Sequence, residues 1–375
     1  MIDSAEAASG RLGAVLRASG NGGLAQVGPH GPWVTTSPAQ ARQVLTDAEV
    51  FDFPVTVSRG TDMSSSFAET RTGHHIYPPL TTDQVERGST TFRTQWRQAV
   101  SALRTTPAGG SFEAMSALRV PMARATCSAI LPDAAEGERD KVADQVLAWI
   151  DALGPVIART RNPGRWSRLR RREESARVTL ESTLGAVLPR LGISESPQVV
   201  ATLLAAGIQV PIAAGAWLLV LVAAADARDA RRFDPDHVVW ETLRIAPPTW
   251  ITARVTRAPV TLAGHRLAAG EVVLVSPLLL GRAPELVPGS PVTVGTFDPD
   301  RWRREDPRPG AWLPFGGGAH ACPGRSLGFR LLRDLAIWAA DQELSLTQRV
   351  RIDQTRGIWP SPATVSFVTS DTMST

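Results

Sequence analysis

Apolar side chains in the last quarter of the chain recur with the spacing of an α-helix, directly after a glycine-rich loop. Leu327, Leu331 and Leu335 stand four residues apart, so they share one face of a helix. The preceding segment, residues 315–324, reads FGGGAHACPG. The pattern places a lone thiol, Cys322, just before the helix N-terminus. There the helix dipole and free backbone N–H groups favour the thiolate.

A second pattern is the uncharged stretch over residues 197–225, which predicts one long helix. About 20 apolar residues suffice to span a membrane. Gln209 and Pro211 lie at the centre of the stretch, however, and Ala and Gly together outnumber Leu. We therefore favour a helix buried on all sides within a large soluble protein, and no membrane span. Pro211 removes one backbone hydrogen bond and predicts a local kink.

Shorter patterns predict further helices and a small β region. Residues 52–79 lack periodicity and are rich in Ser, Thr, Gly and Pro, which predicts a loop. The other predicted elements are a hairpin of 25–27 and 32–35, a helix from Pro38 through Leu45, a helix at 81–103, a helix that begins after Asp234, a strand at 249–255, and a hairpin of 260–267 with 271–276 around Gly264 and Gly270. The sequence thus predicts one large, mainly α-helical domain with a small β region over residues 1–375.

Composition is that of an ordinary globular protein, with 43% hydrophobic and 20% charged residues. Residues 1–17 contain charges and no apolar run, so we expect no signal peptide and a cytoplasmic location. Two cysteines make no disulfide framework, and Cys127 is expected in the core.

The net charge of +4 comes almost entirely from arginine, since Lys141 is the single lysine. The densest run lies between residues 158 and 174, where Trp166 interrupts seven arginines. Nucleic-acid binding has no aromatic platform or finger pattern to support it. An acidic carrier protein or anionic substrate is a second interpretation. A solvated loop and helix face is the third, which we favour. The arginines are Arg159, Arg161, Arg165, Arg168, Arg170, Arg171 and Arg172.

The chemistry of the glycine-rich loop centres on Cys322. One interpretation is a small buried hydrophobic residue. The other is a soft metal ligand, and a single thiolate suits haem iron better than a zinc or iron–sulfur site. Gly316 and its glycine neighbours have no side chains, so a flat and bulky group can approach the backbone.

The spacing of this loop resembles the haem-binding loop of the cytochrome P450 family: Phe, two residues, Gly, three residues, Cys, one residue, Gly. Phe315, Gly318, Cys322 and Gly324 fill the four fixed places. The resemblance implies haem b as cofactor, Cys322 as the iron ligand, and His320 as a partner of a haem propionate.

Other positions match the family in the right order. Glu241 and Arg244 resemble its Glu-x-x-Arg pair, which braces the core on the haem side. The resemblance assigns Arg254 to a propionate and a basic residue of the helix at 81–103 to the other. For the latter we expect Arg97, with Arg93 as the alternative; a solvated arginine pair is the competing interpretation. The substrate pocket implied by the resemblance comprises Ala206, Val210, Thr249, Trp250, Ile251, Ile358 and Trp359.

The long helix departs from the family pattern. Where the family has Ala-Gly, any residue, an acid and Thr, this chain has Gln209 and Val210 in place of the acid and the alcohol. An amide cannot relay a proton by ionising, and valine cannot form hydrogen bonds through its side chain. The catalytic position that normally moves protons is therefore altered.

The resemblance implies a monooxygenase that oxidises a small molecule with O2 and electrons from a ferredoxin and its reductase, in bacterial secondary metabolism. A non-hydroxylating oxidase stays open, with aryl cross-linking of a peptide, desaturation, nitration or peroxide-driven chemistry. A haem-binding protein without turnover also stays open. Arg325, Arg330 and Arg333 are expected to form the face that docks an acidic ferredoxin.

Overall fold

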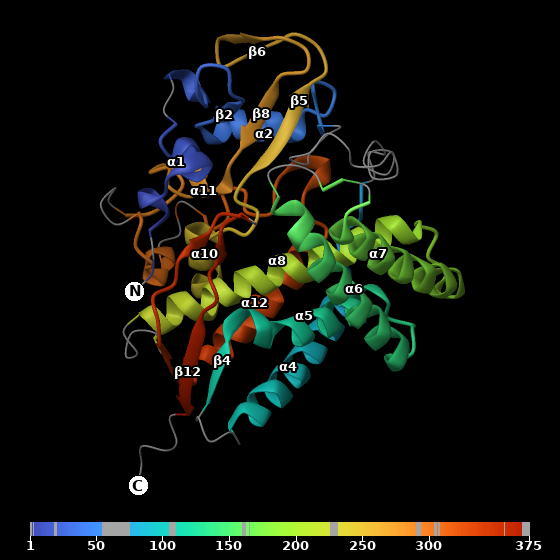
Figure 1. Ribbon diagram of the computed structural model, residues 1–375. Coiled ribbons are helices and arrows are strands. Elements are labelled where there is room, and N and C mark those ends of the chain that lie inside the picture. The colour runs from blue at the N-terminus through green and yellow to red at the C-terminus, as the bar shows by residue number, and fades with distance from the viewer. Residues whose placement is uncertain are drawn as a thin grey trace.

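The computed structural model describes residues 2, 4–18, 21–54, 76–104, 110–159, 163–164, 166–225, 232–289, 294–303, 306, 308–355 and 357–369. A helical body occupies most of the molecule, and a β-rich lobe lies at one end of it (Figure 1). This confirms the predicted mainly α-helical class with a small β region. Most of the loop predicted at 52–79 lies outside the described residues.

The helical body is built around α8 (Pro197–Ala224), which crosses its centre (Figure 1). Its most apolar window is long enough to span a membrane, yet 67% of that window is buried within the protein. This agrees with the predicted core helix. The other helices are α1 (Gly10–Leu16), α2 (Pro38–Thr46), α4 (Thr82–Arg104), α5 (Ala114–Ile130), α6 (Glu136–Ile157), α7 (Arg168–Val187), α10 (Pro235–Ile245), α11 (Pro277–Leu280) and α12 (Arg325–Ala340).

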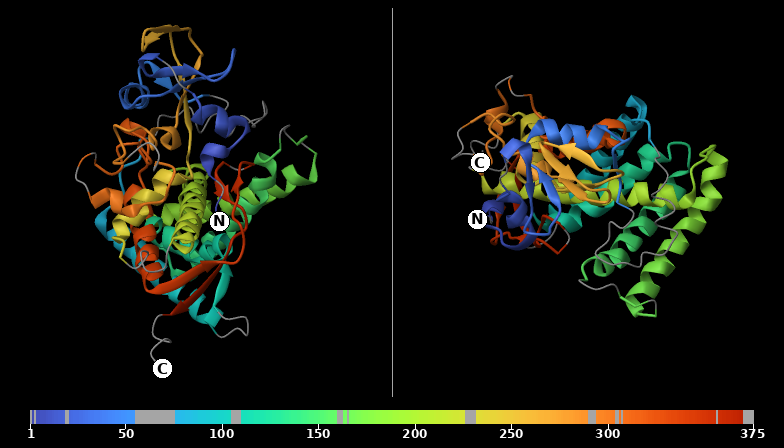
Figure 2. Two further views of the ribbon diagram at one scale, coloured as in Figure 1. Left: turned by 90° about the vertical axis from the view of Figure 1, so that its left-hand side faces the viewer. Right: turned by 90° about the horizontal axis from the view of Figure 1, so that it is seen from above.

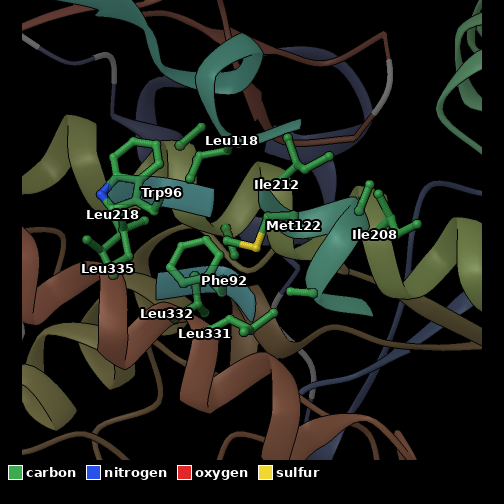
Figure 3. Packing of buried hydrophobic residues seen from close by; sticks show 14 of the residues in the cluster. Phe92, Trp96, Leu118, Met122, Ile208, Ile212, Leu218, Leu331, Leu332 and Leu335 are labelled. Atoms are coloured by element: carbon green, nitrogen blue, oxygen red, sulfur yellow. The ribbon is translucent and has the colours of Figure 1, made fainter. Parts of the chain in front are cut away.

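The core of the body lies between α4, α5, α8 and α12 (Figure 3). Gly215 of α8 permits the close approach, because a Cβ there would lie 3.0 Å from Leu118 and 3.1 Å from Leu335. In Figure 3, Ile208 lies to the right of Leu218 on α8, and Leu331 lies to the right of Leu335 on α12, so the two helices run in the same direction across the cluster. Since α8 packs on α12, their N-terminal halves lie at the same end of the core.

The β lobe contains a five-stranded sheet in the order β1-β2-β8-β5-β3, with α2 beside it (Figures 1 and 2). β1 and β2 form the hairpin predicted near the N-terminus. The strands of this sheet are β1 (Leu24–Gln26), β2 (Trp33–Thr35), β3 (Phe51–Asp52), β5 (Thr252–Thr256) and β8 (Val272–Val275). A three-stranded sheet at the opposite end comprises β4 (Ser111–Glu113), β9 (Gln342–Leu346) and β12 (Thr364–Thr369), and a short pair comprises β10 (Ile352–Asp353) and β11 (Trp359–Pro360).

One predicted hairpin was wrong. Residues 260–267 do not pair with 271–276; they fold back on themselves as β6 (Val260–Leu262) and β7 (His265–Leu267). Gly264 has φ 80°, a left-handed conformation that glycine adopts without strain and that closes this two-residue turn. β8 pairs instead with β5 and, in parallel, with β2.

Candidate functional site

The loop that carries Cys322 is fixed by its own backbone and by α2. The Cys322 N–H donates to Phe315 O at 2.9 Å, which closes the loop. Gly318 has φ 70°, and a Cβ there would lie 2.5 Å from Leu45 O at the end of α2. Only glycine fits this position. On the other side, Leu80 N donates to Pro323 O at 3.2 Å.

Cys322 is exposed, and α12 begins three residues later. Burial of the thiol by the surrounding chain raises the pKa of Cys322 above its ordinary value, while a hydrogen bond from the Gly324 backbone and the Arg325 charge lower it. The helix start therefore favours the thiolate as expected, and desolvation of the thiol opposes it with the larger effect. Metal coordination deprotonates a thiol regardless of this shift.

His320 and Arg254 both contact the aromatic ring of Phe53. The guanidinium of Arg254 lies 3.9 Å from the ring centroid of Phe53, and the His320 ring meets Phe53 edge-on at 4.9 Å between centroids. Arg254 is 5% exposed, and its Nη1 donates to Ala253 O at 2.9 Å. Burial lowers the pKa of Arg254, and the Asp52 carboxylate opposes this shift. Two expected anion-binding groups thus lie close together, and Phe53, which contacts both, was not predicted.

Arg97 lies elsewhere. On α4, a Cβ on Gly88 would lie 2.6 Å from Leu327, near the start of α12, whereas Trp96 stacks edge-on against Trp338 at 5.0 Å, near its end. The two helices therefore run in the same direction, and Arg97 lies roughly 14 Å along α4 from Gly88, away from Cys322.

The side chains support this correction. Arg97 is exposed and its Nε donates to Arg93 O at 3.2 Å, while Arg93 pairs with Glu86 at 3.2 Å. The competing interpretation, a solvated arginine pair, describes them better. The arginine of α4 that lies next to Gly88 is Arg87, whose side chain is exposed.

Glu241 and Arg244 form a fully buried ion pair, as expected for a structural brace. Arg244 Nη2 lies 2.6 Å from Glu241 Oε1, and its Nε lies 2.8 Å from Oε2. The remaining Arg244 donors bind the backbone oxygens of Gly281, Val294 and Thr296. The Arg244 guanidinium therefore donates to three backbone oxygens as well as to the Glu241 carboxylate.

A second arginine completes the cluster, and sequence reasoning missed it. Arg301 Nε donates to Glu241 Oε1 at 2.9 Å, and Trp302 Nε1 donates to Oε2 at 3.0 Å. Arg301 is 6% exposed and also binds Pro288 O and Thr296 O. No local sequence signal pairs Arg301 with Glu241, because 60 residues separate them.

The face of α8 near residue 210 is open. Val210 is 39% exposed and Ala206 is exposed, although α8 is otherwise largely buried; Gln209 is half-buried. Ala206, Val210 and Trp217 share this face at helical spacing. Trp217 Nε1 donates to Ile358 O at 2.6 Å, so the turn before β11 lies on the same face.

Pro211 does not interrupt α8, and Thr126 of α5 compensates for its missing N–H. In a regular helix residue 211 would donate to Gly207 O, which proline cannot do. The hydroxyl of Thr126 lies 3.2 Å from Gly207 O and 2.8 Å from Met122 O in its own helix. Thr126 is 1% exposed, so without its hydroxyl the Gly207 carbonyl would lose a hydrogen-bond donor in the core.

We expect Thr126→Val to lower the free energy of unfolding by about 1–3 kcal/mol, the cost of an unsatisfied buried acceptor. The same change should cost less in a Pro211→Ala background, where the restored backbone N–H serves Gly207. Urea unfolding of the four proteins of this double-mutant cycle measures the coupling. Thr126→Ser keeps the hydroxyl and is the matched control; equal costs in both backgrounds would contradict the pairing.

Two expected pocket residues have packing roles instead. Trp250 is 5% and Ile358 is 1% exposed, and both belong to an apolar cluster with Leu12, Val34 and Leu278. Their side chains are therefore enclosed by protein rather than presented to a ligand. Thr249 is exposed, and Ile251 and Trp359 are half-buried.

The arginines of α12 are mostly committed to internal pairs. Arg330 lies 3.1 Å from Glu86 and 3.4 Å from Asp334, and Arg333 lies 2.7 Å from Asp236. Only Arg325 of the expected docking triplet is exposed without an ion pair to a described residue. The face expected to dock a ferredoxin is thus less positive than the sequence indicates.

Comparisons with known proteins bear on this loop and its brace. A sequence model of the family described as "Cytochrome P450" matches residues 236–332, which include Glu241, Arg244 and Cys322. The cyclooctat-9-en-7-ol 5-monooxygenase of Streptomyces melanosporofaciens is 42% identical over 90 residues, which cover 23% of this chain and 19% of that protein. The alignment with this relative thus spans about a fifth of its length.

Solved structures match over nearly the whole chain. The crystal structure of P450BioI in complex with an acyl carrier protein ligated to hexadec-9Z-enoic acid has a TM-score of 0.68 at 16% identity, and the match covers 90% of this chain and 93% of that one. CYP109E1 from Bacillus megaterium, in complex with corticosterone, has a TM-score of 0.67 at 17% identity, with 92% and 94% covered. These likenesses confirm the fold.

Residues 236–332, which hold the glycine loop and its buried brace, match the cytochrome P450 family, and the whole chain has the fold of the solved cytochrome P450 structures. Proteins of this family bind haem b through a cysteine thiolate. The residues present fit that group: the exposed Cys322 would supply the thiolate, and the cationic Arg254, which contacts Phe53 together with His320, would suit a carboxylate.

Arg254→Leu should weaken haem binding by about 10-fold or more, because one charge-assisted hydrogen bond contributes roughly 1.5–3 kcal/mol. Haem loss to an excess of a scavenging apoprotein measures this directly. Arg97→Leu is the matched control and should release haem at the wild-type rate. The assignment fails if Arg97→Leu releases haem faster and Arg254→Leu does not.

Proposed function

We propose that this protein is a monooxygenase that oxidises a small molecule with O2 and two electrons from a ferredoxin and its reductase. The observation that carries the proposal is the exposed Cys322 at the start of α12, at the end of the core where α8 exposes Ala206 and Val210. Thiolate-ligated haem, when bound, supplies the activation of O2.

The protein's own residues have distinct tasks in this proposal. Cys322 would hold the iron, and Arg254 with His320 would neutralise the haem carboxylates. Ala206 and Val210 give an apolar wall against which a substrate can lie without water. Gln209 can orient a water molecule or a polar substrate group through its amide, but it cannot release a proton.

The test is the mass of the product. Purified protein with ferredoxin, its reductase and 18O2 should give a product heavier by one labelled oxygen. Candidate substrates are compounds made by enzymes encoded nearby, since a role in bacterial secondary metabolism is part of the proposal. A substrate-induced change in the haem spectrum with no product would instead indicate a haem-binding protein without turnover.

Non-hydroxylating oxidation is the second candidate, and the residues at 209 and 210 favour it. Val210 is exposed where the family has an alcohol, and Gln209 stands in place of the acid. Cross-linking or desaturation would give a product lighter by two hydrogens. The double variant Gln209→Glu/Val210→Thr should then change the ratio of product to peroxide on the true substrate. If the ratio and the product are unchanged, Gln209 and Val210 do not determine the course of the reaction.

Two acidic partners complete the proposal. A ferredoxin would dock near Arg325, and reduction should slow with added salt, since surface attraction is screened beyond about 10 Å at 0.1 M. An acidic carrier protein that presents the substrate is the second partner; P450BioI, which shares the fold, has been crystallised with such a protein. We place the protein in the cytoplasm, where both partners are available.

A further inference from the structure

A cluster of arginines at the start of α7 stands apart from the proposed haem site. α6 and α7 project from the side of the helical body (Figure 2). Residues 159–172 contain seven arginines and no acidic residue. Arg159, Arg168, Arg171 and Arg172 are exposed, and Trp166 between them is 79% exposed.

Arg168, Arg171 and Arg172 differ from many other surface arginines in having no acidic partner among the described residues. Arg177, on the same helix, lies 3.6 Å from Glu173 and 3.1 Å from Glu181. Ion pairs also hold surface arginines elsewhere, among them Arg93, Arg119, Arg124, Arg190, Arg257, Arg303, Arg330 and Arg333.

The position of the cluster is unfavourable for the isolated protein. Ser167 caps α7, and its hydroxyl oxygen accepts from Arg170 N at 3.2 Å. The first turn holds no acidic residue, so the positive end of the helix dipole faces several cations. Proteins depart from the preference for acidic residues at a helix N-terminus mainly where function requires it. Here an anionic partner would offset the repulsion between the arginines and the helix dipole.

A groove lies beside the arginine cluster, between α6 and α7. It encloses about 440 Å³ and is lined by alanines and polar groups, with Arg172 among them. Gln145 Oε1, also in the lining, is buried and has no hydrogen-bond partner. The lining residues are Gln145, Ala148, Asp151, Ala152, Arg172, Ser175, Ala176 and Thr179.

We propose that this face of α6 and α7 docks the acidic carrier protein, with Trp166 as the apolar anchor and the arginines as partners of its carboxylates. The inference rests on the carrier protein proposed above. Trp and Arg dominate the binding energy of protein interfaces, and both are exposed on this face. A bilayer would instead require a broad apolar face.

Calorimetric titration of the haem-loaded protein with a purified bacterial acyl carrier protein tests the proposal. Arg168→Glu/Arg171→Glu/Arg172→Glu should weaken binding at least about 10-fold. It should not lower the melting temperature, because acidic residues are favourable at a helix N-terminus. Trp166→Ala should weaken binding as well.

The matched control reverses three exposed arginines elsewhere, Arg42→Glu/Arg266→Glu/Arg351→Glu, for the same change in net charge. It should bind as wild type does. Equal weakening in both triple variants, or no binding of the carrier protein to the wild type, overturns the proposal. Vesicles that contain phosphatidylglycerol are titrated in parallel; binding to them in place of the carrier protein would make the face a membrane contact and overturn it too.

The proposed oxidation is tested by separate measurements. The α7 variant should keep the carbon monoxide spectrum of wild type and its rate with an unattached substrate, so loss of docking alone leaves the haem chemistry intact. A wild type that lacks the thiolate spectrum but binds the carrier protein would contradict the proposed function and not the docking face.

Discussion

Cys322→Ala should abolish the long-wavelength absorption band that reduced, carbon monoxide-bound haem shows when a thiolate is its ligand. The reason is that Cys322 is the exposed thiol of the loop, fixed by the 2.9 Å hydrogen bond to Phe315 O. Without a thiolate, O–O cleavage loses its electronic support, and oxidation of any substrate should fall below detection. The measurement is the difference spectrum of the purified, haem-reconstituted variant.

The other cysteine provides the control. Cys127 is fully buried in the core, and burial raises its pKa to about 12, so it remains a neutral thiol at physiological pH. Cys127→Ala should therefore keep the band, at a modest cost in stability. A band retained in Cys322→Ala, or lost in Cys127→Ala with the protein still folded, would refute the assignment.

Glu241→Ala should lower the free energy of unfolding by about 3–5 kcal/mol, because it leaves Arg244 and Arg301 as buried, uncompensated charges. The side chains of both arginines are at most 2% exposed, and Glu241 also accepts hydrogen bonds from Asp298 N and Trp302 Nε1. A domain with 5–15 kcal/mol of stability would lose a large part of it. Urea unfolding monitored by tryptophan fluorescence gives the change.

Glu241→Gln is the milder variant if the alanine protein does not accumulate. It keeps an acceptor but loses the charge, so its unfolding midpoint should fall between those of wild type and Glu241→Ala. Asp151→Ala breaks the exposed pair with Arg119 and should cost no more than about 1 kcal/mol. A cost for Glu241→Gln no greater than that of Asp151→Ala would show that the buried cluster contributes little.

Local spacing predicted the parts of this protein that are set by local physics. The period of Leu327, Leu331 and Leu335 located α12, and the uncharged stretch located α8 almost to the residue. The loop with Cys322 and the Glu241–Arg244 pair were visible because their members are close in sequence. Each depends on contacts that the neighbouring residues themselves provide.

Features that depend on how distant segments pack were missed. Arg97 was misassigned because its position relative to Cys322 depends on the direction of α4 along α12, which Gly88 and Trp96 reveal only in the structure. Arg301 was missed because 60 residues separate it from Glu241. Trp250 and Ile358 were assigned to a pocket because an apolar side chain reads the same in a sequence whether it lines a cavity or fills the core.

The contact of Gly318 with the end of α2 joins the helical body to the β lobe. The loop that holds Cys322 precedes α12 of the helical body, whereas α2 belongs with the sheet of the β lobe. The position of the Cys322 sulfur thus depends on contacts with both the helical body and the β lobe. Proteolysis of the β lobe, or a destabilising substitution in it far from the loop, would therefore weaken the contact that positions Cys322. We therefore expect substitutions in the β lobe that do not touch the haem site to change how long the bound cofactor is retained.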